Sequence, residues 1–143
     1  MSSSKTYLFV HAVWAVGGTR PLLVRSVRTV LAAHMLKIAE ERGIQVLKAN
    51  GGTDHLHVLL QLHPAQNLAQ ILRQLKSESS DWLNATRIVP ETFEWEEDYV
   101  AYSVSPNVIR QVSDYIDRQD DFHKNKSFEE EMAVFASMQS SQS

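Results

Sequence analysis

Cysteine, long apolar segments and an excess of positive charge are all missing from this sequence of 143 residues. Without cysteine the chain can form no disulfide, thiol nucleophile or zinc–thiolate site. Its most apolar early stretch, residues 8–16, is far shorter than the ~20 residues that cross a membrane, and no signal peptide is evident. We therefore expect a cytoplasmic protein.

The net charge of −3 at pH 7 does not favour binding to nucleic acid, because phosphate contacts normally require a basic surface. The acidic residues, however, are concentrated in runs at 91–98, 114–121 and 129–131. The remainder of the chain is basic. Its candidate phosphate contacts are Arg20, Arg73 and Lys76, with ordinary solvated surface as the alternative for each.

Hydrophobic periodicity predicts alternating strands and helices. We expect strands at 5–16, 44–49, 54–60 and 93–104, the last in two pieces around Glu97-Asp98, and helices at 26–42, 66–86, 106–124 and 128–138. This order predicts an α+β fold, a ferredoxin-like βαββαβ sandwich whose antiparallel sheet carries helices on one face, followed by a C-terminal helix. We expect a single domain over residues 1–143, with 139–143 as a frayed tail.

The third predicted strand carries two histidines separated by one apolar residue. Side chains alternate across a strand, so His55 and His57 share a face while Leu56 points into the core. Such a pair can bind one divalent metal ion if a third ligand is supplied, or it can be two packed or surface histidines. Asp54 can support a histidine or cap the turn before it. His11, on the first strand, is expected to be half-buried, and lining the site is its alternative.

A third ligand is available on the helix predicted at 106–124. Gln119 lies within the apolar face of that helix, and burying an amide without a partner costs ~1–3 kcal/mol. A metal ion is one such partner. Tyr115 lies one turn earlier, so its hydroxyl can reach the same point. The alternative is a core tyrosine bonded to a core glutamine.

These segments also resemble a known family. The strand 54–60 resembles the His-hydrophobe-His motif of HUH endonucleases. Three later segments are similar to consecutive parts of their smallest branch: the strand before the catalytic helix, the helix with its nucleophile and ligand, and the segment after it (95–105, 115–119 and 127–131). That branch is the single-tyrosine transposase family of minimal bacterial insertion sequences, with its repeat-associated relatives. The resemblance covers residues 7–132.

The resemblance implies an activity, a cofactor and partners. It implies that Tyr115 is the nucleophile and that His55, His57 and Gln119 hold Mg²⁺ or Mn²⁺. The expected substrate is single-stranded DNA with hairpins at the element ends, cleaved and rejoined through a 5′-phosphotyrosine. The expected assembly is a homodimer with active sites shared in trans.

Other functions remain open at this point. A domesticated relative would act as a nuclease on host repeats that form hairpins. A non-catalytic nucleic-acid-binding module reads bases with exposed aromatic residues on its central strands, whereas the central strand here carries histidines. A two-histidine phosphoesterase needs a second His-x-Thr/Ser motif, and the sequence has none.

Overall fold

The computed structural model describes residues 4–119 and 127–141. These residues form a four-stranded sheet of strand order β2-β3-β1-β4, and every neighbouring pair in it is antiparallel. The strands are β1 (Leu8–Ala15), β2 (Gln45–Gly51), β3 (His55–Leu62) and β4 (Val100–Val104). With one helix after β1 and another after β3, this order confirms the predicted ferredoxin-like fold.

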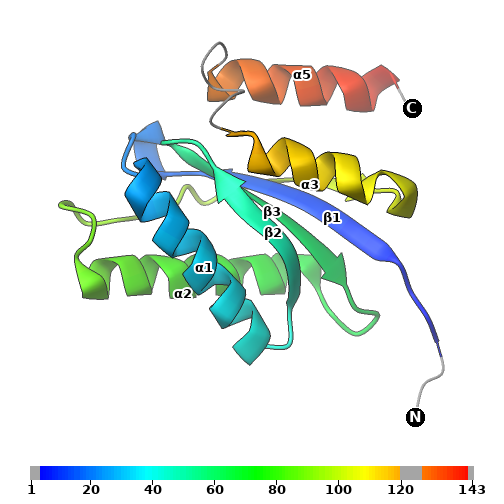
Figure 1. Cartoon of the computed structure of the whole chain (residues 1–143), viewed down its shortest axis with the longest axis horizontal. Helices are drawn as coiled ribbons and strands as arrows, with labels where there is room; N and C mark the ends of the chain where they lie inside the picture. Colours follow the sequence, from blue (N-terminus) through cyan, green and yellow to red (C-terminus); the bar gives the residue numbers. More distant parts are fainter. Residues whose placement is uncertain (1–3, 120–126, 142–143) are drawn as a thin grey trace.

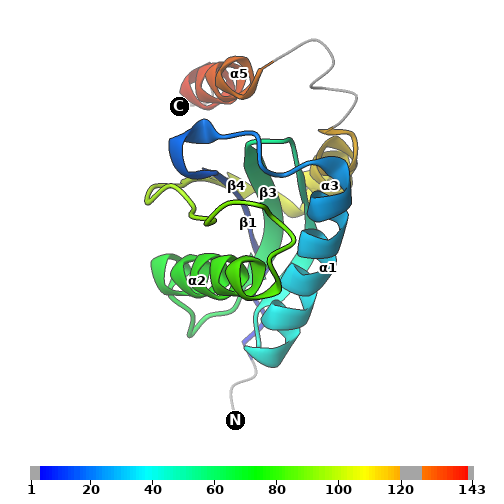
Figure 2. The same cartoon turned by 90° about the vertical axis from the view of Figure 1, so that its left-hand side faces the viewer.

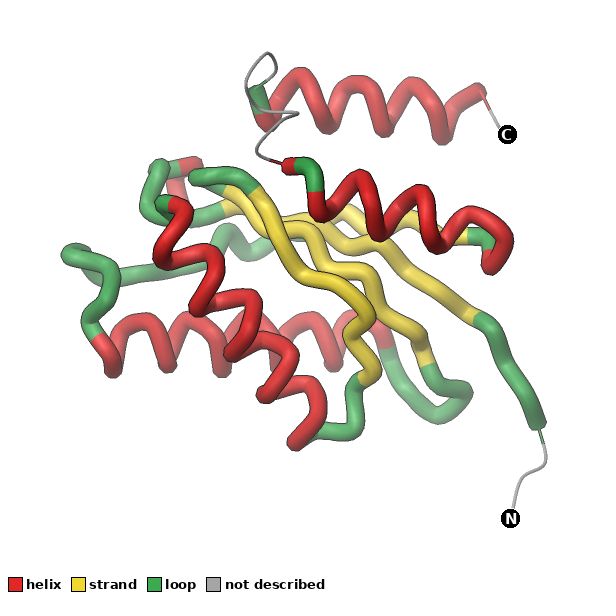
Figure 3. The backbone as a smooth tube through the Cα atoms, viewed as in Figure 1, coloured by secondary structure: helices red, strands yellow, loops and turns green. Residues whose placement is uncertain are grey.

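The helices lie on both sides of the sheet (Figures 1 and 3). Helices α1 (Arg25–Glu41) and α2 (Leu68–Thr86) are the helices of the ferredoxin-like unit and cover one face. Helix α3 (Ile109–Asp117) covers the opposite face, and α5 (Phe128–Ser141) lies beyond α3 on that side, as both views show (Figure 2). Among the described residues, no helix combines the length and apolarity needed to cross a membrane.

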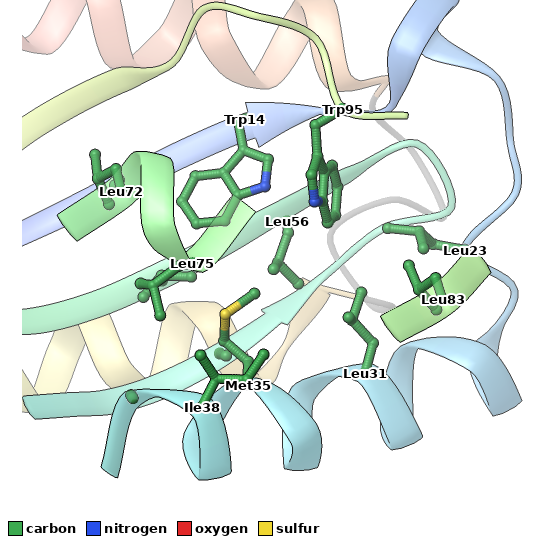
Figure 4. Packing of buried hydrophobic residues seen from close by; sticks show 14 of the residues in the cluster. Trp14, Leu23, Leu31, Met35, Ile38, Leu56, Leu72, Leu75, Leu83 and Trp95 are labelled. Atoms are coloured by element: carbon green, nitrogen blue, oxygen red, sulfur yellow. The ribbon is translucent and has the colours of Figure 1, made fainter. Parts of the chain in front are cut away.

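The main core lies between the sheet and the α1–α2 layer (Figure 4). Leu56 from β3 packs there together with Trp14 from β1 and Leu31 from α1, all fully buried. Because side chains alternate along β3, His55 and His57 face the opposite side. A smaller apolar cluster of Leu59, Val104 and Ile116 holds α3 against that second face. This arrangement places the histidine pair under α3.

The extended segment expected at 93–104 forms two pieces, as predicted: β4 over Val100–Val104 and an isolated bridge between Trp95 and Val16. The acidic residues 96–98 separate them. Two predicted helices have different bounds in the structure. The helix expected at 106–124 begins as a 3-10 turn at Pro106 and becomes α3 over Ile109–Asp117; its expected end lies outside the described residues. Helix α5 continues to Ser141, so most of the tail expected to fray is helical.

Candidate active site

The turn between β2 and β3 determines where the histidine strand begins. The Gly52 N–H donates to the His55 carbonyl at 3.1 Å. A Cβ atom added to Gly51 would collide with that same carbonyl oxygen. A side chain at position 51 would therefore push the two strands apart and displace His55. Gly51 and Gly52 thus form the tight connection that positions His55 at the start of β3.

Both histidines of the pair are fully buried, and each is held through its Nδ1 atom. Asp54 Oδ1 lies 2.7 Å from His55 Nδ1. His11 Nε2 lies 2.7 Å from His57 Nδ1, with the two rings stacked at a centroid distance of 5.0 Å. Partners at Nδ1 leave the Nε2 atoms for another ligand. His11 was expected to be a half-buried strand residue, but it is only 2% exposed and contacts the pair directly.

Helix α3 carries Tyr115, and Gln119, expected within the same helix, follows two residues after its end at Asp117. The C-terminal end of α3 is tied to β2, because the Asn50 side-chain amide donates to the Ile116 carbonyl at 2.9 Å and Lys48 pairs with Asp117 at 3.1 Å. The Tyr115 ring meets the His57 ring edge-on at a centroid distance of 5.7 Å, and its hydroxyl is buried. Gln119 is fully buried, with its Oε1 3.1 Å from His55 Nε2. The four residues predicted from the sequence are thus adjacent.

Helix α5 contributes a carboxylate that the sequence analysis did not identify. Glu131 is fully buried; its Oε1 lies 3.1 Å from His55 Nε2, and its Oε2 lies 3.2 Å from His57 Nε2. Gln119 Nε2 donates to Oε2 at 3.0 Å. Among the described residues, His55, His57 and Glu131 form a group whose ligand atoms lie within 4.8 Å of one another.

The start of α5 explains why this carboxylate turns inward. Ser127 and Glu130 form a capping box: Ser127 Oγ accepts from the Glu130 N–H at 3.2 Å, and Glu130 Oε1 accepts from Ser127. This cap sets the phase of the helix. Phe128 and Glu131, three residues apart, therefore share a face. Phe128 stacks on His55 at a centroid distance of 4.3 Å.

The charges in the site complement one another. Burial alone would lower the pKa of His55, but hydrogen bonds to the Asp54 and Glu131 carboxylates outweigh it and raise the pKa. Burial would raise the pKa of Glu131, but its bonds to the two histidines lower it. Burial and the neighbouring His57 reduce the pKa of His11 to about 3, so His11 is neutral at pH 7. The site thus holds an anionic carboxylate facing the imidazoles.

Two of the three candidate DNA contacts bond within the chain. Arg20 pairs with Glu91 at 2.7 Å and donates to the Gly17 carbonyl. Lys76 donates to the carbonyls of Glu96 and Glu97 at 2.7 and 2.8 Å. Arg73 lines a groove between α2 and the segment 94–99. Arg20 and Lys76 therefore hold loops of this chain, and a role in binding phosphate would need those bonds to be exchanged.

The site thus combines two histidines on a strand of the sheet, a tyrosine on the helix packed over them and a glutamine just after that helix. The chain belongs to the IS200-like transposase family, whose model matches residues 4–119. This confirms the family predicted from the sequence. The match contains Tyr115 and the residues at 55, 57 and 119, whereas Glu131 and all of α5 lie beyond its end.

Individual relatives agree with this assignment. The chain is 27% identical over 131 residues to the ISDra2 transposase TnpA of Deinococcus radiodurans, a match covering 85% of this chain and 92% of the relative. The fold is similar to a crystal structure described as a transposase of D. radiodurans R1, with a TM-score of 0.67, 22% identity and coverage of 83% and 95%. It is also similar to a REP-associated tyrosine transposase bound to a REP hairpin, with a TM-score of 0.60, 16% identity and coverage of 86% and 74%.

Proposed function

We propose that this transposase cleaves and rejoins single-stranded DNA at hairpin-bearing element ends through a 5′-phosphotyrosine on Tyr115, and that it requires a divalent metal ion. The main support for the proposal is that α3 and the residues just after it pack against β3. Tyr115 lies edge-on to His57, and Gln119 lies 3.1 Å from His55. A nucleophile and three metal-binding donors thus share one buried point.

The donor set can hold a divalent cation. Two imidazole nitrogens and an amide oxygen leave positions open for a phosphate, and we propose Mg²⁺ or Mn²⁺ because these ions serve phosphoryl transfer. Neighbouring ligands of an ion with bonds of about 2.1 Å lie about 3.0 Å apart in an octahedron and about 3.4 Å apart in a tetrahedron. The separation of 3.1 Å between His55 Nε2 and Gln119 Oε1 falls in that interval. When bound, the ion would supply charge to the scissile phosphate and the departing oxygen.

The residues of the chain perform the remaining tasks. The Tyr115 oxygen loses its proton and forms a bond to phosphorus, the bond from phosphorus to the 3′ oxygen breaks, and that oxygen takes up a proton. A 3′-hydroxyl attacking the phosphotyrosine reverses these changes, so strands are rejoined without an external energy source. Asp54 and His11, bonded to Nδ1 of His55 and His57, orient both imidazoles toward the phosphate. We place this activity in the cytoplasm, where the DNA is.

A cleavage assay on DNA from around the gene tests the proposal. Single-stranded oligonucleotides that carry its flanking imperfect palindromes should yield a free 3′-hydroxyl fragment and a denaturant-resistant protein–DNA adduct in Mn²⁺. Excess chelator should abolish both products and leave hairpin binding intact, because binding depends on phosphate and groove contacts. Full cleavage in chelator would contradict the metal requirement. Binding without any cleavage in Mn²⁺ would favour a non-catalytic module.

A nuclease acting on dispersed repeats is the second candidate function. The structural similarity to a REP-associated tyrosine transposase bound to a REP hairpin favours it. The position of the substrate palindromes separates the two functions. Palindromes that flank the gene as a pair support a mobile element, whereas cleavage only at palindromes scattered elsewhere supports the domesticated enzyme.

We further propose a homodimer in which Tyr115 of one subunit acts at the histidine pair of the other. Strand β4 is an edge strand of the sheet, and its Val100 is 43% exposed. Pairing of two such edges would cover them. In the structure, α3 packs against the sheet of its own chain, where Asn50 and Lys48 of β2 bond to its C-terminal end. The α3 helix of a second subunit could form the same two contacts. The polar segment 120–126 would let α3 dock on either subunit, and it lies outside the described residues.

Mixed dimers distinguish shared sites from sites within one chain. We expect a heterodimer of Tyr115→Phe and His57→Ala subunits to cleave DNA at about half the wild-type rate, because it regains one complete site, while each homodimer is inactive. Heterodimers isolated with two different affinity tags provide the measurement. An inactive heterodimer would mean that each site is built in cis. A protein that sediments as a monomer at micromolar concentration would contradict the dimer itself.

A further inference from the structure

The carboxylate of Glu131 has no role in the activity proposed above, yet it lies at the centre of the candidate metal site. Its residue is fully buried, as are His55, His57 and Gln119. Burying a carboxylate is costly unless it is paired with a cation or with several donors. Here both oxygens face the atoms expected to bind the metal ion. The burial of Glu131 among these atoms therefore indicates that its carboxylate has a role at the site.

We propose that Glu131 is a fourth protein ligand of the metal ion, which makes the site His₂–Gln–Glu and fastens α5 over it. This inference rests on the proposed metal requirement. The separations support it: Oε1 is 3.1 Å from His55 Nε2, and Oε2 is 3.2 Å from His57 Nε2. Both values fall between the octahedral and tetrahedral spacings of about 3.0 and 3.4 Å for adjacent ligands.

The chemistry of the ion supports the same assignment. Two imidazoles and one amide are neutral donors, and hard cations such as Mg²⁺ and Mn²⁺ prefer oxygen ligands that carry charge. Glu131 adds that anionic oxygen.

The local structure of α5 holds Glu131 in this position. The capping box of Ser127 and Glu130 fixes the start of the helix, and Phe128 stacks on His55. Glu129, in the same turn, is exposed. The acidic first turn thus contains one inward carboxylate and a solvent-facing neighbour of the same type. Glu129 is the matched control.

Manganese binding to the full-length protein without DNA tests the proposal. The electron paramagnetic resonance signal of free Mn²⁺ gives the dissociation constant. Glu131→Gln, which keeps the shape and removes the charge, should weaken binding by about tenfold or more, and Glu129→Gln should bind like the wild type. Wild-type affinity in Glu131→Gln, with binding lost in His57→Ala, would overturn this inference and leave the proposed metal site intact. A wild-type protein that does not bind Mn²⁺ would overturn both.

Hydrogen exchange gives a second readout that does not depend on affinity alone. If Glu131 binds the ion, saturating Mn²⁺ should slow amide exchange in α5 of the wild-type protein and of Glu129→Gln. The same addition should leave exchange in α5 of Glu131→Gln unchanged. Equal protection of α5 in all three proteins would overturn the proposal. Exchange in α1, which is remote from the site, verifies that each variant is folded.

Discussion

Replacing Tyr115 by phenylalanine is expected to abolish strand cleavage and formation of the covalent protein–DNA adduct. The substitution removes the only atom proposed to attack phosphorus, so we expect the cleavage rate to fall by about 10⁴-fold or more. The ring remains and can keep its edge-on contact with His57. Loss of the buried hydroxyl should therefore change the free energy of unfolding by about 1 kcal/mol or less. Denaturing gel electrophoresis of labelled DNA measures the adduct.

Tyr102 provides the matched control. It lies on β4, and its ring is 6.3 Å from the His11 ring, the same centroid distance as that of Tyr115. Tyr102→Phe should retain the adduct. If Tyr115→Phe still forms an adduct and Tyr102→Phe does not, the nucleophile lies on the strand and the proposed role of α3 is wrong.

Replacing His57 by alanine is expected to remove metal binding and cleavage together. His57 is fully buried, and its Nε2 faces the other donors, so no solvent-exposed group can substitute for it. Metal catalysis contributes several kcal/mol to such reactions, and each 1.36 kcal/mol is a factor of ten in rate. We therefore expect a loss of about a thousandfold or more. Calorimetric titration with Mn²⁺ and the cleavage assay measure the two effects.

His63→Ala is the control for removing a histidine from the same part of the chain. His63 follows the end of β3 and is partly exposed. The His63→Ala protein should bind Mn²⁺ and cleave DNA like the wild type. Circular dichroism must show that His57→Ala is folded, since a deletion in a packed region can cost ~2 kcal/mol or more. A folded His57→Ala protein that retains full cleavage would refute a catalytic metal at this site.

Local sequence rules predicted the order of the elements and which residues share a face. Alternation along 54–60 placed His55 and His57 on the face opposite Leu56, and the structure has that arrangement. Helical spacing placed Tyr115 and Gln119 on one helix; Tyr115 lies on α3, Gln119 follows its end, and both reach the histidine pair. The alternation rule succeeds because it depends only on neighbouring residues of one strand.

The contribution of His11 could not be read from the sequence. It depends on the pairing of β1 with β3, in which Val13 lies opposite His57 and His11 opposite Leu59. Only that register brings His11 diagonally beside His57. A shift by one residue would turn the side chain to the other face of the sheet. Strand register is a long-range property, and nothing near residue 11 specifies it.

Glu131 also shows the difference between what the local sequence predicts and what tertiary packing decides. The sequence by itself predicted a helix that begins at residue 128 with an acidic first turn, and a histidine pair that shares a strand face. It did not determine which carboxylate turns inward, because an acidic run usually faces solvent. Only the docking of α5 placed Glu131 beside His55 and His57 and enclosed all three groups. Local residue order sets the periodicity of each element, whereas burial depends on which elements pack together across the whole chain.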